Sequence, residues 1–330
     1  MATIIRLKNL TPLHIGTGKE NYDFSAALLQ SDTISAALAS VRAQMGKKND
    51  IHGFMESFTV SSAFPYSGNR LFLPKPIGKL AVSVSEADEY PSRKKLKKIR
   101  WIEFDLWKQL MNGNTLVVSS NQLNGDFLLS ADNKLPFANP FKSQVNQRVS
   151  VPRDDNSKTE PFFFDWTYFN ENSGLYCLLD APKNVEEEIL DLFKKLGEYG
   201  IGTDKNIGGG KFEVDDSQKI VFDSKENANA LMLLSLFIPT KDEIDTLHLE
   251  KASYELVLRG GYMAGSEEDE FKHLRKKSIY AFSIGSLFPI SAKLGGKVVD
   301  LRPDWNDERM HPVFRSGKPF VVPVKLKDYE

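Results

Sequence analysis

The stretch YGIGTDKNIGGGK, residues 199–211, joins a predicted helix to a predicted strand and contains five glycines and two lysines. Glycine adopts backbone conformations closed to other residues and lets a bulky partner approach the main chain. Successive free N–H groups in such a loop form a concave site for phosphate oxygens. The stretch therefore predicts either a plain helix-to-strand connection with glycine at the helix C-cap or a surface that a partner approaches closely.

The order of elements excludes the common nucleotide-binding loops. Walker A and dinucleotide-binding loops run from a strand into a helix, whereas this loop runs from a helix into a strand. Gly210 and Lys211 are also followed by Phe212, where a Walker A loop has Ser or Thr. A longer polyanion such as RNA is then the leading functional candidate, beside the plain connection.

The sequence around the loop predicts a β-α-β unit on either side of a long insertion. Upstream come a strand at 3–10, a helix from about Ser31 to Met45 that Asp32 can cap, and apolar segments at 58–64 and 71–76. The second unit has strands at 162–169, 175–180 and 211–214 and a helix at 185–198, for which Asn184 and Glu187 form a predicted capping pair. This order is the ferredoxin-like pattern, which the RNA-recognition motif shares.

We therefore predict an α+β protein of two domains. The first spans residues 1–218, with an insertion at about 80–145 and the glycine-rich loop at 200–210, and the second spans 228–330. The insertion contains PSRKKLKKIR at 91–100, which predicts a helix whose basic face is either solvated or laid along a phosphate backbone.

Composition limits where a nucleic acid can bind. The 330 residues carry 43 Lys and Arg against 44 Asp and Glu, so an RNA site must be a local basic patch. The single cysteine, Cys177, lies in the apolar run LYCLLD and predicts a buried thiol, in keeping with a reducing cytoplasm. The apolar run at 230–239 is too short to cross a bilayer, and we expect a cytoplasmic protein.

Several motifs occur in an order that one family shares. They are PLHIGTG (12–18), SDTISAAL (31–38), SSAFPYSGNRLFLPKP (61–76), NQRVSVPRDDNSKTEPFFF (146–164), the glycine-rich loop, LVLRGGY (256–262), SIYAFSIGSLF (278–288), GGKVVDLRP (295–303) and HPVFRSGKPFVVP (311–323). The chain thereby resembles CRISPR-associated RAMP proteins, and more narrowly subunit four of type III-A (Csm) effector complexes.

The resemblance implies tandem ferredoxin-like (RRM-like) domains, the first with a thumb-like insertion, and a role without chemistry or cofactors. Such a subunit holds the repeat-derived 5′ tag of the crRNA in antiviral defence. Its implied protein partners are the large polymerase-cyclase subunit and the backbone RAMP subunit. Forked guanidinium groups and glycine turns suit phosphate contacts. The candidate RNA-binding residues are His14, Gly16, Thr17, Lys75, Arg148, Ser150, Arg153, Lys205, Gly208, Gly209, Gly210, Lys211 and Arg259.

One alternative remains open at this stage. His14 could be the general base of a metal-independent RAMP endoribonuclease that processes precursor crRNA, since a histidine titrates near neutral pH. The other interpretation of His14 is a hydrogen bond to the backbone or to RNA. No Asp, Glu, His or Cys cluster has metal-ligand spacing, so no metal site is predicted.

Overall fold

The computed structural model describes residues 1–16, 22–26, 28–85, 89–131, 137–151, 159–215, 218–222, 227–263, 268–304, 307–327 and 329. Helices and strands are interspersed along the whole chain, and the main sheet is largely antiparallel. The predicted α+β class is confirmed.

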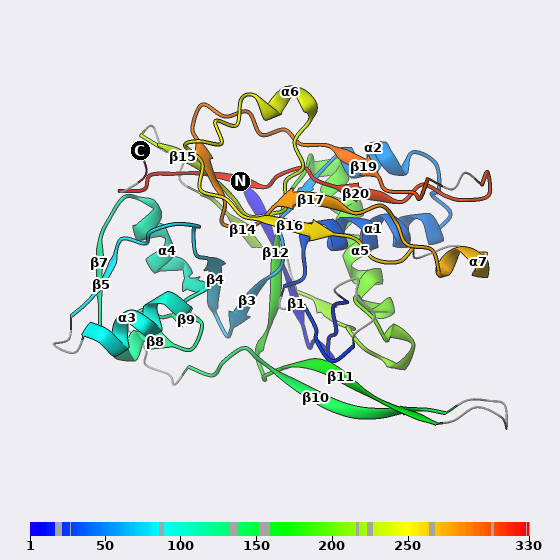
Figure 1. Cartoon of the computed structure of the whole chain (residues 1–330), viewed down its shortest axis with the longest axis horizontal. Helices are drawn as coiled ribbons and strands as arrows, with labels where there is room; N and C mark the ends of the chain where they lie inside the picture. Colours follow the sequence, from blue (N-terminus) through cyan, green and yellow to red (C-terminus); the bar gives the residue numbers. More distant parts are fainter. Residues whose placement is uncertain are drawn as a thin grey trace.

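A long mixed sheet forms the centre of the first two thirds of the chain (Figure 1). Its order is β13-β1-β12-β3-β4-β6-β9-β8, with β14 also beside β1 and β2 beside β12. The strands are β1 (Ala2–Lys8), β2 (Thr59–Val60), β3 (Phe64–Ser67), β4 (Arg70–Pro74), β6 (Trp101–Glu103), β8 (Leu123–Asn124), β9 (Phe127–Leu128), β12 (Ser173–Asp180), β13 (Glu213–Val214) and β14 (Gln218–Ile220). Strands β1 and β12 are apolar on both faces, which places them at the centre of two cores.

Three helices cover one face of this sheet: α1 (Ser31–Gln44), α2 (Ile51–Glu56) and α5 (Lys183–Tyr199). Alternate residues of the central strands, such as Ile5 and Cys177, pack against them, and burial raises the pKa of the Cys177 thiol. The predicted side-chain caps are wrong, because α1 is preceded by Gln30 and α5 by Pro182, neither of which caps through its side chain.

The far end of the sheet carries a mainly helical layer. It consists of α3 (Glu89–Lys98), α4 (Phe104–Met111), η1 (Ser120–Gln122) and the parallel pair β5 (Val82–Val84) and β7 (Leu116–Val118). Part of the segment predicted as an insertion thus extends the main sheet through β6, β9 and β8. The basic side chains of α3 from Arg93 to Lys98 are mainly exposed.

A long hairpin leaves the body of the protein beside the glycine-rich loop. Strands β10 (Phe141–Ser150) and β11 (Glu160–Phe169) pair antiparallel along their whole length and project away from the sheet (Figure 1). The base of β11 returns to the body, because Leu13 and Thr167 exchange backbone hydrogen bonds of 2.9 Å.

The last third of the chain consists of short antiparallel pairs packed against α1, α2 and α4. Its elements are β15 (Ala230–Leu233), α6 (Lys241–Ile244), β16 (Leu256–Arg259), α7 (Asp269–Lys272), β17 (Ile279–Phe282), β18 (Leu287–Pro289), β19 (Val298–Asp300), β20 (Phe314–Ser316) and β21 (Val321–Val324). It is joined to the first part by buried hydrogen bonds, including Leu236 N–H to Ser31 Oγ at 3.0 Å. Within the part of the chain that the structure describes, no helix has the length and apolarity needed to cross a membrane.

Candidate nucleic-acid interface

The glycine-rich loop folds back onto the segment that contains His14. Thr203 N–H donates to His14 O at 3.0 Å, and Gly210 N–H donates to Pro12 O at 3.0 Å. The hydroxyl of Thr11 donates to Gly208 O at 2.7 Å. A short 3-10 helix, η2 (Lys205–Ile207), forms the tip of the loop. The segment around His14 and the glycine-rich loop are about 190 residues apart in the sequence, and they form one structural unit.

Close packing within the chain explains why the loop needs glycine. A Cβ on Gly209 would lie 2.8 Å from the Trp166 ring, and one on Gly210 would lie 1.8 Å from Ile201 O. Gly210 also has φ +66, a conformation that other residues rarely adopt. The N–H groups of Gly208 and Gly209 donate to the carbonyls of Lys205 and Asp204. Their hydrogen-bonding capacity is used inside the loop, so these two amides do not form a phosphate nest.

Arg148 connects the long hairpin to the glycine-rich loop. Its guanidinium group forms an ion pair with Asp204 and lies 4.1 Å from the centroid of the Phe164 ring. It also stacks near Trp166, at 5.2 Å. Arg148 thus has partners inside the protein, while Ser150, at the end of the same strand, is exposed. A ligand reaching this surface would meet an arginine whose charge is already shared with a carboxylate.

His14 is buried under the hairpin. Only 1% of its surface is exposed, its Nδ1 lies 2.7 Å from Asp165 O, and its ring centroid is 4.4 Å from that of Phe164. A general base must reach the proton that it removes. In this arrangement the imidazole reaches the backbone of β11 instead, which matches the hydrogen-bonding interpretation of His14.

Arg259 forms the main ion pair between the two parts of the chain. Its Nε and Nη2 donate to the two carboxylate oxygens of Asp32 at 3.1 and 3.0 Å, and Nη2 also donates to Thr33 Oγ1 at 3.0 Å. Arg315 approaches the same carboxylate at 4.0 Å. Burial alone would raise the pKa of Asp32, but the charges of Arg259, Arg315 and Lys276 and the hydrogen bonds from Arg259 together outweigh it and hold that pKa below its usual range.

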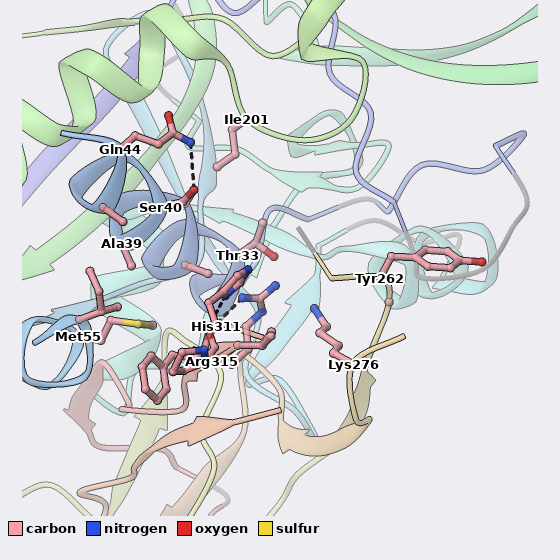
Figure 2. A pocket seen from close by; sticks show the side chains of 18 of the residues that line it. Thr33, Ala39, Ser40, Gln44, Met55, Ile201, Tyr262, Lys276, His311 and Arg315 are labelled. Atoms are coloured by element: carbon pink, nitrogen blue, oxygen red, sulfur yellow. Dashed lines mark hydrogen bonds between the residues drawn. The ribbon is translucent and has the colours of Figure 1, made fainter. Parts of the chain in front are cut away.

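These residues border a pocket of about 1530 Å³ between α1, the glycine-rich loop and the C-terminal part. Three of the residues predicted to bind RNA line it: Gly16, Lys205 and Arg259. Figure 2 shows Thr33, Lys276 and Arg315 gathered on one side of the pocket, with Tyr262 further out. Among the residues that the structure describes, the pocket is lined by six lysines or arginines and two acids, namely Lys48, Lys205, Arg259, Lys276, Arg309 and Arg315 against Asp50 and Glu268.

The pKa of Lys276, a cation of this pocket, is strongly lowered. Burial lowers its pKa to about 7, and the neighbouring charges of Arg315 and Arg259 act in the same direction. Among the described residues, the Asp32 carboxylate raises the pKa of Lys276, but it offsets only part of this lowering. A lysine that is half charged near neutral pH responds to any anion placed beside it.

Lys75 and Lys211, which are also predicted to bind RNA, are not among the residues that line this pocket. Lys75 lies at the end of β4, where its backbone packs against Gly285 of the C-terminal part. Lys211 is exposed, and its N–H donates to Thr11 Oγ1 at 2.8 Å. Thr17 and Arg153 lie outside the described residues.

Sequence reasoning missed Lys276 and Arg315. Both are ordinary basic residues in polar stretches, and no local pattern marks them as half-buried. The motif HPVFRSGKPFVVP contains Arg315 and was the one available signal, although it did not indicate which side chain faces the pocket. No group of three or more potential metal ligands occurs among the residues that the structure describes.

Comparison with known proteins places this arrangement in a family. The model of the RAMP superfamily matches residues 6–213, which is more than half of the chain. The chain belongs to the RAMP superfamily. A second model, that of the CRISPR Csm4 C-terminal domain, matches residues 226–324.

Several RAMP relatives resemble the chain over most of its length. The Csm4 protein of Thermococcus onnurineus is 24% identical over 277 residues, covering 80% of this chain and 84% of the relative. Csm4 of Mycobacterium tuberculosis strain CDC 1551 is 25% identical, covering 92% and 93%. Csm4 of Streptococcus thermophilus is 24% identical, covering 95% and 96%. The resemblance to subunit four of type III-A complexes, expected from the motifs, is confirmed.

Solved RAMP structures share the fold. A chain in the crystal structure of a Csm3–Csm4 subcomplex of the type III-A interference complex superposes with a TM-score of 0.61 at 19% identity, covering 98% of this chain and 100% of that one. A chain in the Csm1–Csm4 cassette bound to cA4 gives a TM-score of 0.60 at 18% identity, covering 98% of each chain.

Proposed function

We propose that this protein is a non-catalytic RNA-binding scaffold subunit of a type III-A CRISPR effector complex, which holds the 5′ tag of the crRNA in antiviral defence. The observation that carries the proposal is the pocket in which Gly16, Lys205 and Arg259 meet. These residues are far apart in the sequence, and the sequence predicts RNA binding for each of them. The excess of basic over acidic side chains around them favours a polyanion.

The surroundings of His14, the candidate general base, and of the Asp32 carboxylate support a role without chemistry. Asp32 is 4% exposed and hydrogen-bonded to Arg259, so its carboxylate is committed to an ion pair within the protein. His14 is buried, with its ring against Phe164. Neither side chain is placed to take a proton from an RNA hydroxyl, and we assign the precursor-processing ribonuclease no part in this proposal.

The partners follow from the relatives. Solved relatives are Csm4 chains in complexes with Csm1 and with Csm3, which supports contacts with the large polymerase-cyclase subunit and with the backbone RAMP subunit. We also propose that the chain consists of tandem ferredoxin-like domains at 1–218 and 228–330. The separate family matches at 6–213 and 226–324 support this division, as does the strand order β13-β1-β12-β3 with α1 and α5 on one face.

Tag recognition is tested in the reconstituted effector complex with guide RNAs that carry or lack the repeat-derived 5′ tag. We expect the wild-type complex to retain the tagged guide preferentially. Replacing Lys205 with glutamine should reduce that preference, because Lys205 is exposed and lines the pocket. Lys194→Gln, on α5 and paired with Asp191, is the matched control for loss of one exposed lysine. Equal retention of both guides by the wild type would contradict the proposal.

The absence of chemistry is tested separately. Purified wild-type protein and His14→Asn are incubated with repeat RNA in the presence of a chelator. We expect intact RNA in both samples. Cleavage by the wild type that His14→Asn loses would replace the scaffold with the ribonuclease.

A further inference from the structure

The inner part of the pocket holds more positive charge than its own carboxylate can balance. Arg259 and Arg315 both approach Asp32, and their side chains are only 22% and 18% exposed. Lys276 is drawn close enough to all three charges for each to influence its ionisation. Three cations therefore surround one carboxylate in a partly desolvated site.

The ammonium group of Lys276 forms no hydrogen bond or ion pair with any residue that the structure describes, although the side chain is half-buried. A cation withdrawn from water without a counter-ion is unfavourable, and proteins usually pair it or leave it outside. Its backbone is fixed, because Lys276 N–H donates to Gly261 O at 3.0 Å, beside the Tyr262–Arg275 bridge. The lysine is thus held in a position that lacks an anion.

A second polar atom of the pocket is also unpartnered. The Nε2 of His311 is buried without a hydrogen bond, while its Nδ1 lies 2.9 Å from Pro312 O. His311 immediately precedes the segment that leads into β20 and carries Arg315. Two unsatisfied side chains that line one pocket point to a missing ligand rather than to an isolated irregularity.

We propose that the Arg259, Lys276 and Arg315 side chains bind one phosphodiester group of a single-stranded RNA. This inference rests on the proposed function and gives its pocket a specific phosphate site. Arginine forks match the geometry of phosphate oxygens, and Lys276 supplies a point charge. With Lys276 protonated, the three cations exceed Asp32 by two positive charges, and a phosphodiester of charge −1 would balance one of them.

The shape of the pocket favours RNA over a compact anion. At about 1530 Å³ it is far larger than a phosphate ion requires, and it continues from the cationic cluster to Gly16 and Lys205 at the glycine-rich loop. Tyr262, which is 40% exposed and lies beyond Lys276 in Figure 2, offers a ring on which a base can stack. Small side chains on α1, including Ala36, Ala37 and Ser40, leave the wall between these points open.

The test compares Lys276→Met with Lys277→Met in the reconstituted complex. Lys276→Met removes an unpaired charge, so the variant is expected to fold at least as well as the wild type. Lys277→Met is the matched control, because Lys277 is the next residue but pairs with Asp304 at the surface. Guide-RNA affinity is measured from low to high salt, with tagged and untagged guides.

We expect Lys276→Met to weaken binding of the tagged guide about tenfold at low salt and to reduce the slope of log K against log salt by about 0.7, as loss of one single-strand phosphate contact predicts. Lys277→Met should match the wild type. Lys276→Arg, which keeps the charge, should retain most of the affinity and the slope.

Two outcomes separate this inference from the proposed function. A wild-type slope that Lys276→Met leaves unchanged overturns the phosphate site, even where the tag preference is intact. Loss of tag preference in the wild type, with a slope that still depends on Lys276, overturns the tag-binding function and retains the phosphate site. Inorganic phosphate at constant ionic strength is the remaining arm: it should not displace bound RNA. Displacement, with a salt slope that Lys276→Met leaves unchanged, would assign the site to free phosphate and overturn the RNA assignment.

Discussion

The guanidinium group of Arg259, at the end of β16, donates two hydrogen bonds to the carboxylate of Asp32, in the first turn of α1 and 227 residues earlier in the chain. The pair joins the C-terminal part to the helix that lines the pocket. It also contributes to the ionised state of a carboxylate that is 4% exposed, because Arg259, together with Arg315 and Lys276, outweighs the penalty of burial. One ion pair therefore fixes both the position of α1 and the cationic side of the pocket.

Removing Asp32 should strongly destabilise the protein. Asp32→Ala leaves Arg259 and Arg315 without their shared carboxylate, and the loss of one partner of a buried pair costs about 3–5 kcal/mol. Urea unfolding at neutral pH measures the change in the free energy of unfolding. Asp126→Ala, which breaks the exposed pair with Arg100, is the control and should cost below about 1 kcal/mol. Similar costs for the two variants would show that the Asp32 pair is not a structural link.

Acid should remove the stabilisation that the Asp32–Arg259 ion pair provides. Because the folded-state pKa of Asp32 is lowered, its contribution is fully present above the unfolded value of about 3.9 and is lost as pH falls through the folded value. We expect the stability difference between wild type and Asp32→Asn to shrink below about pH 4. Unfolding curves between pH 3 and pH 7 measure it, and a constant difference across that range would contradict the assignment.

Lys276 should make the stability of the RNA-free protein rise with pH. Its folded pKa is about 7 and its unfolded pKa is about 10.4, so the unfolded chain binds more protons between these values and stability increases with pH there. The slope per pH unit is at most about 1.4 kcal/mol. Lys276→Met should flatten this dependence between pH 7 and pH 9, whereas Lys277→Met should keep it. Bound RNA should reduce the rise of stability with pH in the wild type, because it favours the charged form of Lys276.

Substitution by alanine should destabilise the protein much more at Gly210 than at Gly208. Gly208 and Gly210 both have positive φ, but an added Cβ meets nothing within 4 Å at Gly208 and lies 1.8 Å from Ile201 O at Gly210. Gly208→Ala carries only the conformational cost of about 1 kcal/mol, while Gly210→Ala must also move the backbone. Thermal unfolding should show a clearly larger loss for Gly210→Ala. Equal losses would mean that the loop rearranges easily.

Arg148 and Asp204 should be energetically coupled. The ion pair is partly exposed, so a double-mutant cycle with Arg148→Met and Asp204→Asn should give a coupling energy of about 0.5–1.5 kcal/mol. Arg148→Met should lose more than that coupling, because the guanidinium also lies against Phe164. A coupling energy of zero would show that this ion pair does not stabilise the contact between the hairpin and the glycine-rich loop.

The sequence predicted the elements whose signals are local. The apolar face of the helix at 185–198, the apolar strand at 3–10 and the glycines of residues 199–211 each report on a few neighbouring residues. The structure has a helix, a strand and a loop at these places. The two capping predictions failed for different reasons, one local and one tertiary. The chain enters α5 at Pro182, before the predicted pair of Asn184 and Glu187, and Asp32 turns its carboxylate to an arginine instead of to its own helix.

The sequence by itself determined the α+β class, the glycine loop and the resemblance to RAMP proteins, because short motifs and periodic burial are written along the chain. Only the tertiary structure decided that the glycines serve contacts with Trp166 and Ile201, and that Arg259 is held by Asp32. It also decided that no residue in the described part of the chain forms an ion pair with Lys276, on which Asp32 acts only through its charge. Burial and charge balance depend on residues brought together from distant positions, and no local pattern of lysines or glycines contains that information.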